Sequence, residues 1–398
     1  IRVCCHVGVL NTKAMRLLGL DERRAAELGH CAGKFDDGRP NGIIKEYALD
    51  DIKQNLPAPN LDTLMDMLIE GQQDLFASGI TSIQSDDLKY VAEGHAHALL
   101  YRLRDAAQSG RLKLRMSEQC LLDTAEKRDA FFAEGFDCSF GGGEFGISCV
   151  KLLLDGSLGA RTALMTEPYA DEPSSSGIGI YTPAELDRIV AAVHRRNMPI
   201  AIHAIGDKAI DMALEAIEKA QTEMPYLKPR HGIVHCQITD APLLERFKKL
   251  GVTAFVQPVF IDYDMDICAS RVGKKKAATS YAWKTLYDAG VCTAFGTDCP
   301  VEPFDVMRGI WCAVSRQKVA GSTPFNPAEA MPLYDALCCY TAAGAYAEGQ
   351  ERSKGIIRAG MLADFAVLDR DIFALPPEDI RSAYVVATYM GGERVYAA

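Results

Sequence analysis

Short apolar runs alternate with amphipathic segments along most of this chain. Apolar residues in the longer segments recur three and four positions apart, which is typical of helices with one buried face. We expect strands at residues 80–83, 112–117, 147–154, 200–203, 232–235, 253–257 and 292–297. We expect the main helices at residues 61–77, 90–109, 124–134, 182–197, 207–221, 241–250, 277–288 and 304–316. Strands that alternate with helices in this way predict a parallel sheet with helical crossovers.

Seven strand–helix units favour an α/β fold of the (β/α)8 TIM-barrel type over an open doubly wound sheet. No glycine fingerprint follows the first strand, so a dinucleotide-binding fold has no support. Seven strands are one fewer than a barrel needs, and the missing one is expected before Gly79. The apolar run at residues 2–5 lies more than one unit's length from Ile80, so we assign it to an inserted segment. We expect residues 1–350 to form a barrel domain that lacks its first strand.

The pattern changes toward both ends of the chain. Residues 11–26 have helical spacing and lead into a polar loop through Gly42. Residues 326–347 predict one further helix, capped by Asn326 and Glu329. Residues 351–398 then alternate between apolar and polar positions. This tail predicts a small antiparallel piece of a β-sandwich beside the barrel.

Composition narrows the environment and the partners of the protein. The 398 residues are 48% hydrophobic and 24% charged, as in a globular protein with a large core. A net charge of −10 argues against a nucleic acid or an anionic membrane as partner. The 13 cysteines include no C-x-x-C pair and predict reduced thiols. With no membrane-spanning run and no signal peptide, we expect a cytoplasmic protein.

Polar residues stand at the carboxyl ends of four of the predicted strands, where a (β/α)8 barrel carries its chemistry. They are Lys151, His203, His235 and Asp298. Each has an ordinary explanation alone, because a lysine can extend to solvent, a histidine can simply be hydrogen bonded, and an aspartate can cap a helix. Together, two imidazoles and a carboxylate are typical ligands of zinc or a similar divalent ion. A lysine joins such a set only as a carbamate.

These residues lie in segments that resemble the amidohydrolase superfamily, in the amidohydrolase family 3 branch of N-substituted formamide deformylase-like and exoenzyme-regulatory-protein-like proteins. The matching segments are VKLLLDGSLGARTA, AIHAIGDKAI, RHGIVHCQ, AFVQP, AFGTDCPVEPF and GMLADFAVLDRD. The resemblance implies that Lys151 is a carboxylated bridging ligand and that His203 and His235 are metal ligands. It implies that Asp298 is both a ligand and the general base. The implied cofactor is one or two divalent ions, expected to be zinc.

The same resemblance implies a hydrolase that cleaves a C–N bond of amide or N-formyl type outside peptides. A metal-bound hydroxide would attack the carbonyl of a small-molecule amide-type substrate, and Asp298 would pass a proton to the leaving nitrogen. The opening segment RVCCHVGVLNTKAM resembles a family segment that carries a substrate-side histidine, here His6. Three more residues near strand ends are expected to line the pocket, namely Arg161, His231 and Gln257.

The chain departs from the family pattern at the first strand, which in the family ends in His-x-His. The His-x-His of this chain, at His95 and His97, has helical spacing, and residues two apart on a helix point about 200° apart. With half of a two-metal site present, we expect weak or no activity. The alternative is a catalytically silent, metal-poor barrel with a binding or regulatory role. The unpaired edges at 80–83 and 292–297 also predict a homo-oligomer.

Overall fold

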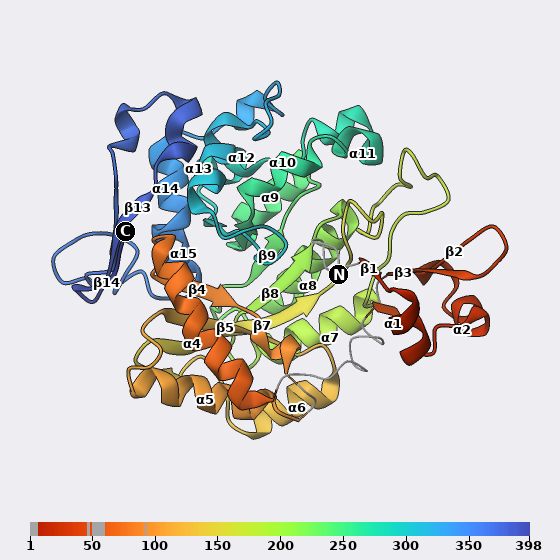
Figure 1. Ribbon diagram of the computed structural model, residues 1–398, viewed down its shortest axis with the longest axis horizontal. Helices are drawn as coiled ribbons and strands as arrows, with labels where there is room; N and C mark the ends of the chain where they lie inside the picture. Colours follow the sequence, from red (N-terminus) through yellow and green to blue (C-terminus); the bar gives the residue numbers. More distant parts are fainter. Residues whose placement is uncertain (1–6, 46–47, 50–59, 92–93) are drawn as a thin grey trace.

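The centre of the molecule is a curved parallel sheet, with helices along its outer side (Figure 1). This computed structural model describes residues 7–45, 48–49, 60–91 and 94–398. The parallel strands follow one another in the sheet in chain order: β4 (Ser82–Ser85), β5 (Arg115–Leu121), β7 (Phe145–Leu153), β8 (Ile200–Ala204), β9 (Gly232–His235), β10 (Thr253–Val256) and β11 (Thr293–Phe295). A two-residue strand, β6 (Gly141–Gly142), pairs antiparallel with β7. All seven predicted strands are confirmed.

Amphipathic helices connect the strands and bury their apolar faces against the sheet. They are α4 (Leu61–Ala77), α5 (Ala96–Gln108), α6 (Ala125–Ala133), α7 (Pro183–His194), α8 (Asp207–Glu223), α9 (Ala241–Leu250), α12 (Trp283–Asp288) and α13 (Val306–Ser315). Helix α7 begins with a capping box in which Thr182 and Glu185 bond each other's backbone N–H groups. The sheet and these helices share one large apolar core, so the predicted α/β barrel architecture is confirmed.

The barrel is open between β4 and β11, because among the described residues neither strand pairs on its outer edge. Helix α15 (Ala342–Ala347) contacts both sides of this opening. The Gln84 Nε2 of β4 donates to Gly344 O at 3.4 Å, and the Cys292 Sγ before β11 donates to Ala343 O at 3.5 Å. A helix therefore lies where an eighth strand would close the barrel.

A buried ion pair follows α15 at the amino ends of β4 and β5. Lys354 Nζ lies 2.5 Å from Glu348 Oε1, and both side chains are at least nine-tenths buried. Lys354 also donates to Ser82 Oγ on β4, and Ser117 Oγ on β5 donates to Glu348. These hydrogen bonds satisfy the buried charges and tie the chain after α15 to the opened side of the barrel.

A small lobe precedes the barrel and has a hydrophobic core of its own. It contains α1 (Thr12–Leu17), α2 (Glu22–Glu27) and a three-stranded antiparallel sheet of β1 (Val7–Val9), β2 (Ala32–Lys34) and β3 (Pro40–Lys45). The single helix predicted for 11–26 is wrong, because Gly19 turns with φ 65° and Asp21 caps a second helix. The predicted polar loop is also wrong, because 32–34 and 40–45 form a hairpin. The predicted strand at 2–5 lies outside the described residues.

The C-terminal elements form a three-stranded antiparallel sheet, as the tail pattern predicts. Its strands are β12 (Phe365–Leu368), β13 (Val385–Met390) and β14 (Glu393–Ala397). The one helix predicted for 326–347 is wrong. It divides into a short turn, α14 (Leu333–Tyr340) and α15, with a break at Thr341. Asn326 does not cap a helix, and its side-chain amide instead donates to the carbonyls of Ala277 and Ser280.

Two other helix boundaries differ from the prediction. The helix predicted from residue 90 begins at Ala96, after a 3-10 turn, η2 (Asp87–Tyr90). The helix predicted for 277–288 is the end of α11 (Cys268–Ala277) followed by α12. Within the described ranges, every helix is too short or too polar to cross a membrane. The cysteines in those ranges are all free thiols.

Candidate active site at the carboxyl ends of the strands

Four polar side chains meet at one edge of the parallel sheet. Lys151 lies near the end of β7, His203 near the end of β8 and His235 at the end of β9, while Asp298 follows β11. The rings of His203 and His235 contact edge to face with centroids 4.5 Å apart. Asp298 interacts electrostatically with Lys151 and with His203. The structure thus places the four residues that the sequence pattern singles out at one edge of the sheet.

Backbone strain marks two of these positions. His235 has φ 80° and Asp298 has φ 59°, in the left-handed region that residues other than glycine rarely adopt. Such conformations cost about 1–3 kcal/mol each and persist where the surrounding structure imposes them. Both residues stand at the point where a buried strand turns into a loop. The tight turns direct functional side chains to the strand ends.

Oxygen acceptors define the tautomers of both histidines. His203 Nε2 lies 3.1 Å from Gly156 O and 3.3 Å from Asp155 Oδ1, so this nitrogen carries the hydrogen. His235 Nδ1 lies 2.8 Å from Gln257 Oε1 and donates to it. The lone pairs therefore reside on Nδ1 of His203 and Nε2 of His235. Metal-binding histidines in proteins are oriented in this way, by a hydrogen bond from the second ring nitrogen.

Asp155, which sequence reasoning missed, locks the loops around His203. Its buried carboxylate accepts hydrogen bonds from the backbone N–H groups of Leu164, Ile205 and Gly206 at 2.9, 3.0 and 2.9 Å. A Cβ at Gly206 would lie 2.0 Å from Leu164 O, so glycine permits this close approach of two loops. The one sequence signal was its place directly after the β7 apolar run.

Burial controls the charge of Lys151 and of Asp298. Burial lowers the pKa of the Lys151 ammonium, although the carboxylates of Asp86 and Asp298 oppose this shift. Burial raises the pKa of Asp298, and electrostatic interactions with Lys151 and His203 oppose that shift. A lysine with a lowered pKa has a larger share of neutral amine, which is the form that reacts with CO2. A carboxylate with a raised pKa can hold a proton nearer to neutral pH.

The donor chemistry of this edge suits a divalent metal ion. Two imidazole nitrogens and one carboxylate are ligands that zinc-type ions prefer. Among the described residues, however, no three His, Cys, Asp or Glu side chains are grouped closely enough to hold a metal. The residue types thus suit a metal although these side chains do not form a preformed three-ligand group, and a carbamate on Lys151 would add oxygen ligands.

The remaining predicted site residues lie in different places. Gln257 belongs to the cluster through His235. Arg161 lies in the loop after β7, where its guanidinium is half-buried and bonds both carboxylate oxygens of Asp171 at 3.1 Å. His6 lies outside the described residues. His231 precedes β9 at the opposite end of the sheet, so the structure does not bring it to the cluster.

Both ring nitrogens of His231 are occupied within the core. Its Nδ1 accepts from the Ile200 N–H at 3.2 Å, and its Nε2 lies 2.8 Å from Nδ1 of His194. The second nitrogen of His194 lies 3.2 Å from Met224 O. Because Met224 O can only accept, Nε2 of His194 donates to it. Nδ1 of His194 therefore accepts, and Nε2 of His231 donates to it. This pair links β8, β9, α7 and the end of α8.

The His-x-His pair lies at the start of α5, with His97 inside the helix and His95 just before it. His95 precedes the first turn of the helix, and the His97 ring packs edge to face on Phe136 with centroids 5.0 Å apart. Neither residue joins the cluster at the strand ends.

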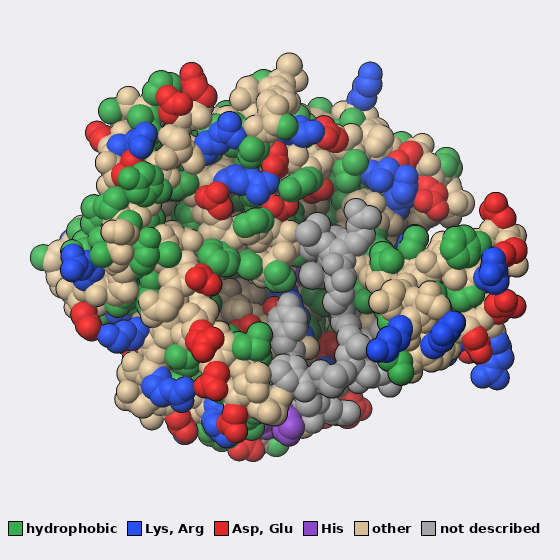
Figure 2. Space-filling view, in the orientation of Figure 1, with side chains coloured by type: hydrophobic (Ala, Val, Ile, Leu, Met, Phe, Trp, Pro, Cys, Tyr) green, Lys and Arg blue, Asp and Glu red, His purple; other side chains and the backbone are tan. Residues whose placement is uncertain are grey.

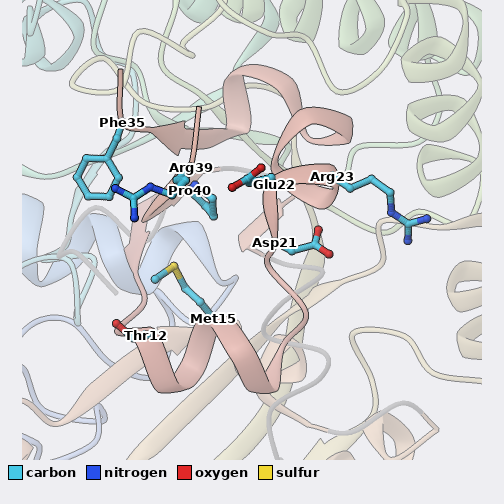
Figure 3. Close-up of a pocket in the computed structure, with 8 residues that line it drawn as sticks. All are labelled: Thr12, Met15, Asp21, Glu22, Arg23, Phe35, Arg39 and Pro40. Atoms are coloured by element: carbon cyan, nitrogen blue, oxygen red, sulfur yellow. The ribbon is translucent and has the colours of Figure 1, made fainter. Parts of the chain in front are cut away.

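A separate cavity of about 600 Å³ lies in the small lobe (Figure 3). Apolar and charged side chains of α1, α2 and the β2–β3 hairpin line it, including Met15, Phe35, Glu22 and Arg39. None of the predicted site residues contributes to this lining. The chemistry at the strand ends and the cavity of the lobe are thus distinct features.

The chain is similar in sequence and in fold to several known proteins. The sequence model described as the amidohydrolase family matches residues 1–396. The protein YtcJ of Bacillus subtilis (strain 168) is 32% identical over 99% of this chain and 73% of its own length. The N-substituted formamide deformylase of Arthrobacter pascens is 24% identical over 98% of this chain and 72% of its own. The crystal structure of an uncharacterized metal-dependent hydrolase from Pyrococcus furiosus is 31% identical, with a TM-score of 0.73 over 94% of this chain and 71% of that one.

Proposed function

This chain belongs to the amidohydrolase family, and on that premise we propose that it hydrolyses a C–N bond of amide or N-formyl type in a small molecule other than a peptide. The observation that carries the proposal is the convergence of Lys151, His203, His235 and Asp298 at one edge of the sheet, with both imidazoles oriented by oxygen acceptors. The name of the deformylase supports cleavage of an N-formyl group, and that of the metal-dependent hydrolase supports hydrolysis that uses a metal ion.

The same four residues would hold a divalent ion, proposed to be zinc, with Lys151 as the carbamate. When bound, such an ion polarises a carbonyl oxygen and activates water at neutral pH. Asp155 and Gln257 keep the two imidazoles in the tautomers that coordination needs. Asp298 would take a proton from the attacking water and deliver it to the leaving nitrogen.

The Asp298→Asn variant tests this assignment, because it keeps the shape of the side chain and removes the base. We expect kcat on an N-formyl amine to fall about 10²–10⁴-fold, the usual contribution of general base catalysis. Elemental analysis of both proteins separates loss of the base from loss of metal. Asp129→Asn, at an exposed position of α6, is the matched control and should keep full activity.

A second function is favoured by one observation, the lack of a preformed three-ligand group among the described His, Cys, Asp and Glu side chains. It is a metal-poor, catalytically silent barrel with a binding or regulatory role. The two functions differ in a direct measurement on protein incubated with excess zinc and bicarbonate. Less than one tenth of an equivalent of bound metal, together with no turnover on a panel of amides and N-formyl amines, would support the silent barrel over the hydrolase.

A further inference from the structure

One peptide plane beside the candidate active site is held from both of its sides. Its carbonyl, Gly156 O, lies 3.1 Å from His203 Nε2 and accepts the hydrogen of that ring nitrogen. Its N–H, which belongs to Ser157, donates to Thr162 Oγ1 at 2.9 Å. The carbonyl and the N–H of a planar trans peptide point in opposite directions. A continuous line of hydrogen bonds therefore runs from the His203 ring through this peptide to the Thr162 hydroxyl.

The turn between Gly156 and Thr162 places the hydroxyl at this peptide. The Gly156 N–H donates to Thr162 O at 3.2 Å, and the Thr162 N–H donates to Ser157 O at 3.1 Å. Thr162 O also accepts from the Ile178 N–H at 3.0 Å, so a later segment of the same loop holds this residue. A Cβ at Gly156 would lie 2.1 Å from Thr162 Oγ1, so glycine is needed for this close approach. Thr162 is buried, which limits competition from water for its oxygen.

Gly156 O is the nearer of the two oxygen acceptors at His203 Nε2. The other, Asp155 Oδ1, lies at 3.3 Å, and its carboxylate already accepts from three backbone N–H groups. A peptide whose N–H donates a hydrogen bond is polarised, and its carbonyl becomes a better acceptor. The contact of the Ser157 N–H with Thr162 Oγ1 thus fixes the direction of Gly156 O and strengthens its bond to the imidazole.

We propose that Thr162 is a positioning residue for His203, which acts through the Gly156–Ser157 peptide and keeps the lone pair of His203 Nδ1 directed for metal binding. This inference deepens the proposed function and rests on it for the role of His203 as a ligand. It also explains why a glycine and a hydroxyl occur together in this turn. The glycine admits the oxygen that the Ser157 N–H requires.

Proton NMR of the His203 Nε2–H, in protein without metal, tests the positioning role, because this signal moves upfield when its hydrogen bond weakens. Thr162→Val keeps the shape of the side chain and removes the acceptor of the Ser157 N–H. We expect the His203 signal to move upfield in this variant. We expect zinc affinity, measured by competition with a chelator, to fall about tenfold, the low end of the effect of losing an orienting partner. Thr162→Ser, which keeps the oxygen, should retain the native signal and affinity.

Thr388→Val is the matched control for the loss of a buried hydroxyl. Thr388 is buried in the C-terminal sheet, where its Oγ1 donates to Phe76 O at 2.6 Å. This variant should lose stability without a change in the His203 signal or in zinc affinity. If Thr162 had a merely structural role, the two valine variants would give the same result.

Circular dichroism shows whether each variant is folded, and Thr162→Ala takes the place of Thr162→Val if the valine variant does not fold. A native His203 signal in the folded variant would overturn the proposal, and so would a native zinc affinity in a protein that binds zinc. The native protein could also bind no zinc while the signal moves in Thr162→Val but not in Thr388→Val. That result would support the positioning of the His203 ring and count against the proposed metal-dependent function.

Discussion

At the residue scale, the two candidate histidine ligands differ in which ring nitrogen an oxygen acceptor engages. His203 donates through Nε2 to the Asp155 and Gly156 side of the site, whereas His235 donates through Nδ1 to Gln257. The residue types alone predict that both can bind metal. The hydrogen-bond partners decide which nitrogen faces the shared centre, because each partner comes from a neighbouring strand or loop.

Gln257 offers a direct test of this arrangement. Gln257→Leu removes the acceptor of the His235 Nδ1–H bond while keeping a side chain of similar size. We expect metal affinity to fall about 10–100-fold, the usual effect of losing an orienting partner of a ligand histidine. Competition with a zinc chelator measures this affinity. Gln108→Leu, at an exposed position of α5, is the control, and equal affinities in both variants would show that Gln257 does not position the ligand.

At the element scale, the buried His194–His231 pair joins the end of α7 to the starts of β8 and β9. The two histidines come from segments 37 residues apart, and together they connect a helix end to two strand starts. Burial lowers the pKa of His231 from 6.5 to about 3, so the folded protein keeps this imidazole neutral. The unfolded chain binds a proton at this position below about pH 6.5, and the folded protein does so only near pH 3.

Stability should therefore fall as the pH decreases from about 6.5 toward 3, and His231 should contribute no pH dependence above that window. We expect His231→Gln to destabilise the protein at pH 7.5. The difference from the native protein should shrink by about 1.4 kcal/mol for each pH unit below 6.5. Urea unfolding at about pH 7.5, 6.5 and 5.5 measures the difference in unfolding free energy between the two proteins. A difference that stays constant with pH would contradict the assignment of a neutral His231.

At the scale of the whole molecule, the described part of the chain leaves apolar surface uncovered beside the C-terminal sheet. Hydrophobic side chains gather on that side of the molecule (Figure 2). The exposed apolar residues in β12 and in the chain before it include Ile356, Ile357, Leu362 and Val367. A groove lined by Ile357, Met361, Leu362 and Phe365 runs through this area. Contiguous apolar surface of this kind is typical of association sites.

We expect the protein to form homo-oligomers through this apolar surface, because α15 already lies over the opening between β4 and β11. Ile357 is 86% exposed, so Ile357→Lys adds a charge to the surface without disturbing the core. Light scattering should show a larger share of monomer for this variant than for the native protein. Val9→Lys, at an exposed site of the small lobe, is the control. A monodisperse monomer in the native protein would contradict the prediction.

The local pattern of apolar and polar residues determined the barrel strands and two complete helices. It also singled out Lys151, His203, His235 and Asp298 at the strand ends. Apolar runs and 3.6-residue periodicity report burial directly, so the limits of α4 and α9 match the predicted ones residue for residue. Parallel strands also share one functional edge, so the residues at their carboxyl ends were predictable as a set. The prediction that His231 lines the pocket overlooked its position in the chain. Because His231 precedes β9, it lies at the opposite end of the parallel sheet from His235.

Tertiary structure decided everything that depends on contacts between distant segments. The helical pattern breaks at Thr341, and α15 then lies in the opening between β4 and β11. The spacing of apolar residues in this segment does not predict that position. Asp155 and Gln257 acquire their roles only through loops and strands far away in the chain. The physical reason is that periodicity records which face of an element is buried, whereas hydrogen-bond partners depend on which elements meet. The sequence by itself therefore determined the barrel strands and the residue types at their ends, and the fold determined the remaining elements and the geometry.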